Sequence, residues 1–176
     1  MRLALLADSH IPFQLPCLPE KLLERIAGVQ LILHAGDLVT GRVLDELQSV
    51  APTLAVAGNC DPRSLRHDLP ERRTERLEEW TVGLAHGHQP HALQDRYIGH
   101  GYDDPAMALF YRLMREQLPE AEIIVFGHFH RPVVKRLQGV WFVNPGAVAP
   151  SYGRSTFALM TLGQDVSVEI VDLTAS

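Results

Sequence analysis

The sequence has few cysteines, no long apolar run and no excess of positive charge. Its two cysteines, Cys17 and Cys60, follow no zinc spacing and define no disulfide framework, so reduced thiols in a cytoplasm are expected. No stretch approaches the roughly 18 apolar residues of a membrane span, and the apolar start over residues 1–7 is too short for a signal peptide. The formal net charge of -5 gives no support for binding a nucleic-acid polymer. We therefore expect a cytoplasmic protein without membrane or nucleic-acid partners.

What the sequence does contain indicates an ordinary globular protein with an unusual amount of histidine. The chain has 176 residues, of which 46% are hydrophobic and 21% charged, and this predicts a single domain over residues 1–176 with a full-sized core. Nine histidines are many for this length, and they require an explanation.

The first third of the chain alternates between short apolar runs and helical patterns. Apolar runs that predict buried strands cover residues 3–7, 29–33 and 53–57, and helical spacing covers residues 20–27 and 41–50. Strand–helix–strand alternation predicts parallel strands with right-handed crossovers. The C-terminal ends of such strands meet at one edge of the sheet, where ligands bind in open α/β sheets.

The rest of the chain predicts a second set of elements. Residues 68–79 have the charge density of a solvated strand or loop, and residues 91–101 are expected to be irregular. Asp104 and Pro105 predict the start of a helix that Pro119 ends. Strands are predicted over residues 80–85 and 122–126, with hairpins over 133–143 and 156–173. The last hairpin offers an edge strand that could pair two copies of the chain.

Metal-ligating side chains follow these strands repeatedly. They are carboxylates, an amide and imidazoles, and all lie just after a predicted strand: Asp8, His10, Asp37, Asn59, His86, His128 and His130. Such groups around one point describe a site for two divalent metals, and a carboxylate such as Asp37 has enough lone pairs to bridge them. These ligand types do not by themselves select among manganese, iron, nickel, cobalt and zinc.

The order of these residues resembles a known family. The motifs Asp8-x-His10, Gly36-Asp37, Gly58-Asn59-x-Asp61, His86-Gly87-His88 and Gly127-His128-x-His130 are similar to those of calcineurin-like metallophosphoesterases. Asn144-Pro145-Gly146 after a hairpin resembles the small bacterial and archaeal phosphodiesterase branch, which is related to the retromer scaffold subunit. The resemblance implies an α/β fold of the four-layer type, a sandwich of two mixed β-sheets flanked by helices.

The resemblance also implies a ligand set and a reaction. One metal would be held by Asp8, His10 and His130, the other by Asn59, His86 and His128, and Asp37 would be shared. Manganese is the first expectation, with nickel, iron, cobalt or zinc as alternatives. A hydroxide bridging the ions would attack phosphorus in line with the leaving group of a small phosphodiester or nucleotide. Asn59 would orient the phosphoryl group.

Cys60 departs from the pattern of many superfamily members, which carry a histidine at this position as a candidate acid for the leaving group. A thiol is only a weak hydrogen-bond donor. We therefore expect rapid hydrolysis of activated esters and slow hydrolysis of alkyl esters, unless His88, His91 or His100 serves as the acid.

Other polar residues have less specific interpretations. Asp61 is expected to orient its neighbours and so support catalysis, His34 to be a hydrogen-bonded core residue, and His88 and His100 to contact substrate. Residues 91–102 are expected to select the substrate. Two other functions remain open, a protein-binding scaffold with a decayed metal site and a phosphomonoesterase or protein phosphatase of the same superfamily.

Overall fold

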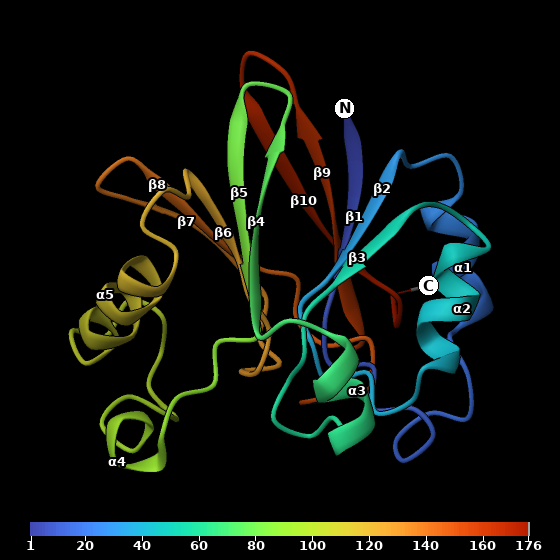
Figure 1. The fold of residues 1–176 in the computed structure, drawn as a ribbon, viewed down its shortest axis with the longest axis horizontal. Coiled ribbons are helices and arrows are strands. Elements are labelled where there is room, and N and C mark those ends of the chain that lie inside the picture. The colour runs from blue at the N-terminus through green and yellow to red at the C-terminus, as the bar shows by residue number, and fades with distance from the viewer. Residues whose placement is uncertain (176) are drawn as a thin grey trace.

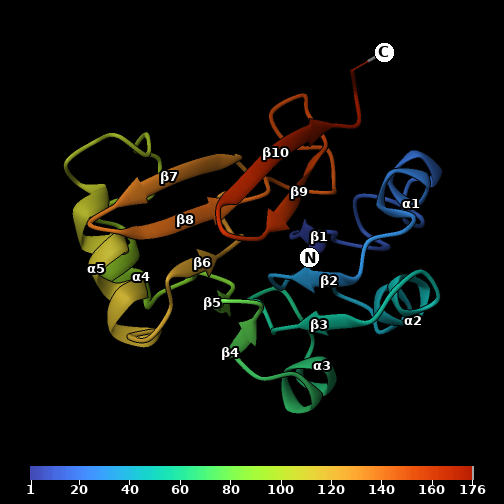
Figure 2. The ribbon, with the colours of Figure 1, turned by 90° about the horizontal axis from the view of Figure 1, so that it is seen from above.

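The computed structural model describes residues 1–175 and has four layers. Two five-stranded sheets, in the orders β10-β9-β1-β2-β3 and β4-β5-β6-β8-β7, face each other. Helices cover the outer face of each sheet, with α1 and α2 on one side and α5 on the other, while α4 lies below α5 (Figure 1, Figure 2). The predicted sandwich of two mixed sheets flanked by helices is confirmed.

The first sheet begins with the parallel strands predicted from the first third of the chain. Its strands are β1 (Arg2–Leu6), β2 (Leu31–His34), β3 (Thr53–Ala55), β9 (Thr156–Leu162) and β10 (Val166–Asp172). β1 pairs in parallel with β2, and β2 with β3, whereas the β9–β10 hairpin adds antiparallel to the other side of β1. β10 is therefore an edge strand, as the sequence predicts.

The second sheet has the same plan, with a parallel centre and antiparallel edges. Its strands are β4 (Arg72–Leu77), β5 (Trp80–Ala85), β6 (Ile123–Val125), β7 (Val133–Leu137) and β8 (Val140–Asn144). β5, β6 and β8 run parallel, while β4 and β7 pair antiparallel to β5 and β8. The charge-rich β4 alternates between exposed and half-buried residues, as expected of a solvated strand.

Apolar side chains fill three layers between these elements. Leu5, Leu33 and Val125 belong to the cluster between the two sheets. Helices α1 (Glu20–Ile26) and α2 (Arg42–Gln48) pack on the outer face of the first sheet through residues such as Leu22 and Leu47. These strands are buried on both faces, which explains their continuous apolar runs.

The outer face of the second sheet carries an aromatic layer. Phe110 and Met114 of α5 (Met107–Gln117) pack with Phe126 and Phe142. The short helices α3 (Arg63–Asp68) and α4 (His91–Gln94) follow β3 and β5. None of the helices among the described residues is long and apolar enough to span a membrane.

Two sequence predictions need correction in the second half of the chain. The stretch over residues 91–101, expected to be irregular, begins with the single turn of α4. The helix predicted from Pro105 begins at Met107, because Asp104 accepts a hydrogen bond from the Ala106 amide in a preceding turn. Trp80 and Trp141 are half-buried and pack against the margin of the inter-sheet cluster.

Candidate metal centre

The candidate ligands gather where the parallel strands of both sheets end. Asp8, Asp37 and Asn59 follow β1, β2 and β3, whereas His86 and His128 follow β5 and β6. These strand ends lie along the lower edge of the two sheets in Figure 1. Residues far apart in the sequence therefore meet at one edge, between the two sheets.

One group of ligand atoms combines a fully buried carboxylate with two imidazoles. Asp8, His10 and His130 each place a ligand atom within 4.8 Å of the others. The Nε2 atoms of His10 and His130 lie 3.2 Å apart, and Asp8 Oδ1 is 3.3 Å from His130 Nε2. Burial lowers the pKa of His10, although the neighbouring carboxylates act in the opposite direction. A lowered pKa favours the neutral imidazole that a metal needs.

A second group shares Asp8 and adds Asp37 and His86. His86 Nε2 is 3.2 Å from Asp37 Oδ2 and 3.1 Å from Asn59 Oδ1. Since His86 Nδ1 donates to the carbonyl of Ala35 at 2.7 Å, a neutral His86 presents a lone pair to two oxygen acceptors. Only a proton or a cation satisfies such a convergence of acceptors, so these residues fit a divalent metal.

The close contact between His86 and Asp37 shifts the pKa values of both residues. Burial opposes charge on His86, but its contact with Asp37 and the nearby Asp8 raise its pKa to about 9. Burial also opposes charge on Asp37, yet the contact with His86 and the Cys60 amide hold its pKa below the ordinary range. Asp37 is thus an ionised carboxylate at neutral pH, as a bridging ligand must be.

Two of the candidate histidine ligands are each oriented by a protein group on the Nδ1 atom of the ring. Ala35 binds Nδ1 of His86, as described above, and Ser151 Oγ lies 3.1 Å from Nδ1 of His130. Such outer contacts fix the ring and leave its other nitrogen for a metal. The sequence patterns did not predict Ser151 as part of the site.

His128 is held differently from the other candidate ligands. Its Nε2 lies 2.8 Å from Oε1 of Gln94 on α4, and its ring centroid is 5.2 Å from that of His86. Burial and the neighbouring His86 lower the pKa of His128 to about 3, so the ring is neutral. Its Nδ1 is the nitrogen left for a metal. Gln94 was missed by sequence reasoning, although Pro90 ahead of it was a usable helix-start signal.

Asp61 binds the backbone of the loops that carry the candidate ligands. Its carboxylate accepts hydrogen bonds from the amides of Asp37, Val39 and Gly58 at 3.0, 2.6 and 2.7 Å. These bonds join the loop after β2 to the loop after β3. This geometry agrees with the predicted orienting role of Asp61.

The backbone at the centre is strained where it presents ligands. Positive φ angles, rare for residues other than glycine, occur at Asp8, His10, Asp37, His128 and His130. Gly58 is needed for a different reason, because a Cβ there would lie 2.1 Å from Asp37 Oδ1. Left-handed backbone concentrated in this way is typical of functional sites.

Two further residues behind the centre support it. His34 is fully buried and its Nε2 lies 2.7 Å from Ser9 Oγ, so the predicted hydrogen-bonded core histidine is confirmed. Buried Asn144 donates to the carbonyl of Gly127 and accepts from the amide of Gly146. Asn144 thereby holds the turn that carries His128, and its contribution to the site is to position this histidine.

Cys60 lies at the mouth of the centre. Its sulfur forms a group with His10 and Asp37 in which all ligand atoms lie within 4.8 Å of one another. Burial and the charge of Asp37 raise the pKa of the thiol to about 12. A thiol in this state is a poor proton donor to a leaving group, in agreement with the departure noted in the sequence.

Two surface grooves flank His128. The first, of about 580 Å³, is lined by His88, His91 and Gln94 together with Asn59, Glu71 and His128. The second, of about 670 Å³, is lined by Ile98, Arg131 and Tyr152 together with Gly99, His128, Phe129 and His130. Residues of the predicted 91–102 segment therefore line both grooves.

The residues predicted to contact substrate are not all brought together. His88 lies beside the centre, with its ring centroid 5.4 Å from that of His86. His100 instead pairs with Asp104, its Nδ1 2.9 Å from Oδ2, on the exposed surface. Among the described residues, the contacts of the His100 imidazole do not reach the centre, and they give its predicted role no support.

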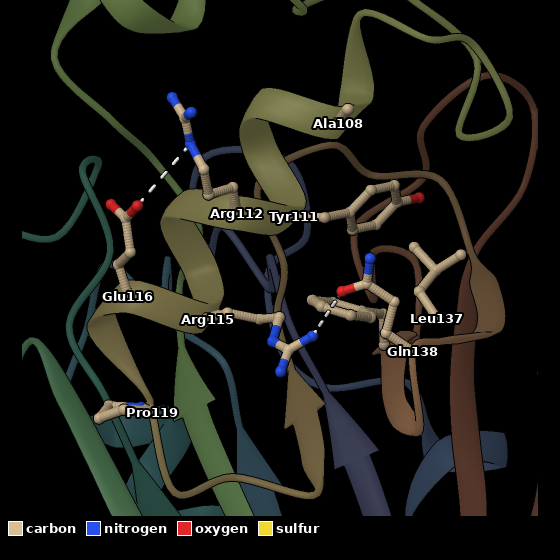
Figure 3. Close-up of a pocket in the computed structure, with 9 residues that line it drawn as sticks. Ala108, Tyr111, Arg112, Arg115, Glu116, Pro119, Leu137 and Gln138 are labelled. Atoms are coloured by element: carbon tan, nitrogen blue, oxygen red, sulfur yellow. Dashed lines mark hydrogen bonds and ion pairs between the residues drawn. The ribbon is translucent and has the colours of Figure 1, made fainter.

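A further cavity lies away from the candidate metal centre. A cavity of about 750 Å³, here called the α5 cavity, lies between α5 and the β7–β8 hairpin and includes Tyr111, Arg115 and Phe142 in its lining. Figure 3 shows Arg115 directed toward Gln138 and Arg112 toward Glu116, with contacts of 2.9 and 3.7 Å. Its charged groups already have partners, and none of the candidate ligands lines it.

The class of protein follows from comparison with known families. Residues 1–165 match the family model of the calcineurin-like phosphoesterase superfamily domain. The chain belongs to this superfamily, and the predicted family is confirmed.

Individual relatives agree with this assignment. A protein named probable metallophosphoesterase from Methanothermobacter thermautotrophicus is 30% identical, over 97% of this chain and 92% of its own. Zinc-complexed Vps29 from Entamoeba histolytica is 25% identical, with a TM-score of 0.72 over 98% of this chain and 99% of its own. A structure described as a novel archaeal phosphodiesterase shares the fold, with a TM-score of 0.73 at 19% identity, covering 98% and 100% of the two chains.

Proposed function

We propose that this protein is a metal-dependent phosphodiesterase that uses two divalent cations to hydrolyse a small phosphodiester or nucleotide. The observation that carries the proposal is the convergence of carboxylate, amide and imidazole ligand atoms at one edge of the two sheets. His86 Nε2, Asp37 Oδ2 and Asn59 Oδ1 face one another within 3.2 Å along the contacts of His86. Membership of the phosphoesterase superfamily supplies the reaction class.

The proposed ligand sets follow the two groups of side chains. Asp8, His10 and His130 form the first set, in which all ligand atoms lie within 4.8 Å. His86 and Asn59, 3.1 Å apart, form the second set with Nδ1 of His128. Asp37 would belong to both sets, since its carboxylate lies 3.7 Å from His10 Nε2 and 3.2 Å from His86 Nε2.

The chemistry divides between the cations and the chain. When bound, a pair of divalent cations supplies Lewis-acid chemistry that activates water and withdraws charge from phosphoryl oxygens. Asn59 and His88 line the groove beside the centre and would orient the phosphoryl group. Asp61 would position Asp37 and Asn59 through the loop amides that it binds.

Two grooves beside the centre support a diester rather than a monoester as the proposed substrate. The two grooves described above meet at His128, one on the His88 side and one on the Tyr152 side. A phosphoryl group at the centre could therefore extend one ester substituent into each groove. A monoester would leave one of them empty.

The decisive test is metal-dependent hydrolysis by chelated protein resupplied with manganese, nickel, cobalt, zinc or magnesium one at a time. Bis(p-nitrophenyl) phosphate and p-nitrophenyl phosphate serve as the diester and the monoester. We expect faster diester hydrolysis, with manganese as the first candidate for the native metal. Folded protein that cleaves neither ester with any metal would contradict the proposal.

The matched control is Asp37→Asn, which keeps the size of the shared ligand and removes its charge. Loss of an outer contact to a metal ligand costs about 10- to 100-fold, and loss of a shared ligand charge should cost more. We expect activity to fall by more than about 100-fold and metal content to fall with it. Retention of both would exclude Asp37 as the bridging ligand.

Cys60→His tests the source of the leaving-group proton. The histidine would offer a donor near neutral pH where the thiol does not. We expect faster hydrolysis of esters with alkoxide leaving groups and little change for p-nitrophenyl esters. An unchanged ratio of the two rates would contradict the assignment of Cys60 as the missing acid.

A protein-binding scaffold is the second candidate function, because the chain shares its fold with Vps29 over nearly its full length. The ligand set argues against a decayed centre, since carboxylates, amide and imidazoles remain at all the expected strand ends. A protein without activity under every metal condition above would favour the scaffold.

A further inference from the structure

An exposed aromatic side chain lies in the second groove beside the centre. Tyr152 is 81% exposed and shares this groove with His128 and His130. Ile98, which is 40% exposed, lines the same groove. Single exposed apolar residues are common, but these two share a groove with candidate metal ligands.

Tyr152 is held in a conformation that its side chain does not favour. Ser151 and Arg154 pair as an antiparallel bridge around Tyr152 and Gly153, whose φ angles are 51° and 77°. Two residues with positive φ between paired neighbours are characteristic of a type I′ turn, which selects Asn-Gly or Asp-Gly. A bulky residue at positive φ is an outlier, and the exposed ring of Tyr152 gains little burial in return.

The same turn is connected to a candidate metal ligand. Ser151, at the base of the turn, lies 3.1 Å from Nδ1 of His130 through its hydroxyl. The backbone bonds between Ser151 and Arg154, at 2.7 and 3.0 Å, keep the turn short and closed. The position of the Tyr152 backbone is therefore fixed relative to the centre.

The groove also carries a fixed positive charge. Arg131 lines it, donates to the carbonyl of His100 at 2.6 Å and lies over the Tyr102 ring at 5.3 Å from its centroid. A cation held in this way favours an anionic ester. The combination of ring, apolar wall and cation suits a planar group attached to a phosphate.

We propose that Tyr152 stacks on a planar aromatic substituent of the phosphoester, either an aryl group or a nucleobase, while the phosphate lies at the metal centre. This inference rests on the proposed function and narrows its substrate class. Stacking tolerates different rings because every ring has a π-face. Ile98 supplies the apolar wall of the same groove.

The test measures binding to metal-loaded protein by calorimetry with two matched pairs of ligands. Inorganic phosphate and phenyl phosphate differ by an aryl ring, and ribose 5-phosphate and adenosine 5′-monophosphate differ by a base. We expect at least one ring-bearing ligand to bind more tightly than its partner. The pair that responds identifies the source of the ring.

Tyr152→Asn is the informative variant, because asparagine suits the turn and removes the ring. Stacking of about 1–3 kcal/mol per base corresponds to roughly a 5- to 150-fold loss of affinity for the ring-bearing ligand. Affinity for phosphate and ribose 5-phosphate should be unchanged, and Tyr152→Phe should retain ring binding. Thermal stability equal to or above that of the wild type would show that the turn remains intact.

Other results would overturn the inference in distinguishable ways. Metal-dependent diester hydrolysis with no preference for ring-bearing ligands, or with equal losses for all four ligands in Tyr152→Asn, would overturn the role of Tyr152 alone. Failure of the wild type to hydrolyse the diester with any metal would overturn the proposed function and the inference together.

Discussion

The candidate metal centre and the α5 cavity differ in burial, in the pairing of their charged groups and in backbone conformation. The cavity has a volume of about 750 Å³, and Arg115 and Arg112, which line it, already have polar partners. The centre holds buried Asp8 and Asp37 among imidazoles, on a backbone with left-handed residues. Convergence of acceptors and local strain mark the centre more clearly than volume does.

The difference has a physical reason. A cavity forms wherever a helix and a hairpin pack imperfectly, and its cost is small if its walls remain solvated. A cluster of carboxylates and imidazoles in a strained backbone is costly to fold without a ligand. Its presence therefore indicates a function that offsets the cost, and substitutions in the two regions should have different consequences.

The largest effect in this comparison is expected from Gly58→Ala. The added Cβ would lie 2.1 Å from Asp37 Oδ1, so either the carboxylate or the loop must move. We expect metal affinity to fall by at least about 10- to 100-fold and unfolding free energy to fall by about 1–3 kcal/mol. Metal titration and thermal denaturation measure the two quantities.

Gly163→Ala is the matched control for this substitution. No atom lies within 4 Å of a Cβ built at Gly163, in the turn between β9 and β10. Unchanged metal affinity is expected there. Equal losses in the two variants would mean that the glycine effect is a general one and does not act through Asp37.

A smaller effect is expected from Gln94→Leu. The substitution removes the group 2.8 Å from His128 Nε2, and loss of such an outer contact typically costs 10- to 100-fold in metal affinity or activity. Gln30→Leu, which removes a surface bond to the Arg2 amide, is the control and should leave metal binding unaltered. If Gln94→Leu behaves like its control, α4 does not position His128.

The smallest effect is expected from Arg115→Ala in the α5 cavity. It breaks the 2.9 Å bond to Gln138 on the surface, and surface substitutions of this kind usually change stability by less than about 0.5 kcal/mol. Metal content and diester hydrolysis should remain at wild-type values. A clear loss of hydrolysis would show that the cavity is coupled to the centre.

The sequence predicts the fold well where packing repeats a simple pattern. The apolar runs at residues 3–7 and 122–126 are strands because both faces of each sheet are covered, one by the other sheet and one by helices. Element boundaries are less predictable. Asp104 has the chemistry of a helix cap, yet it closes a turn ahead of α5, since local hydrogen bonding does not specify how many turns precede a helix.

The candidate site is predictable only for the residues that carry ligand chemistry. Asp8 and Asp37 stand at the ends of neighbouring parallel strands, so their meeting follows from parallel topology, whereas His86 joins them because the second sheet packs against the first. Gln94 and Ser151 contact the histidines only because segments distant in the sequence fold against them. Nothing in their immediate neighbours marks them as parts of a metal centre.

The placement of the ligands between two sheets has a consequence for assembly of the protein. The first sheet supplies Asp8, His10, Asp37 and Asn59, and the second supplies His86, His128 and His130. Neither sheet alone holds all the residues proposed to bind the cations, so under the proposed function tight cation binding would have to follow docking of the two sheets. Cation binding would then stabilise the native state. At a cation concentration a hundredfold above the dissociation constant, it would add about 2.7 kcal/mol to the free energy of unfolding.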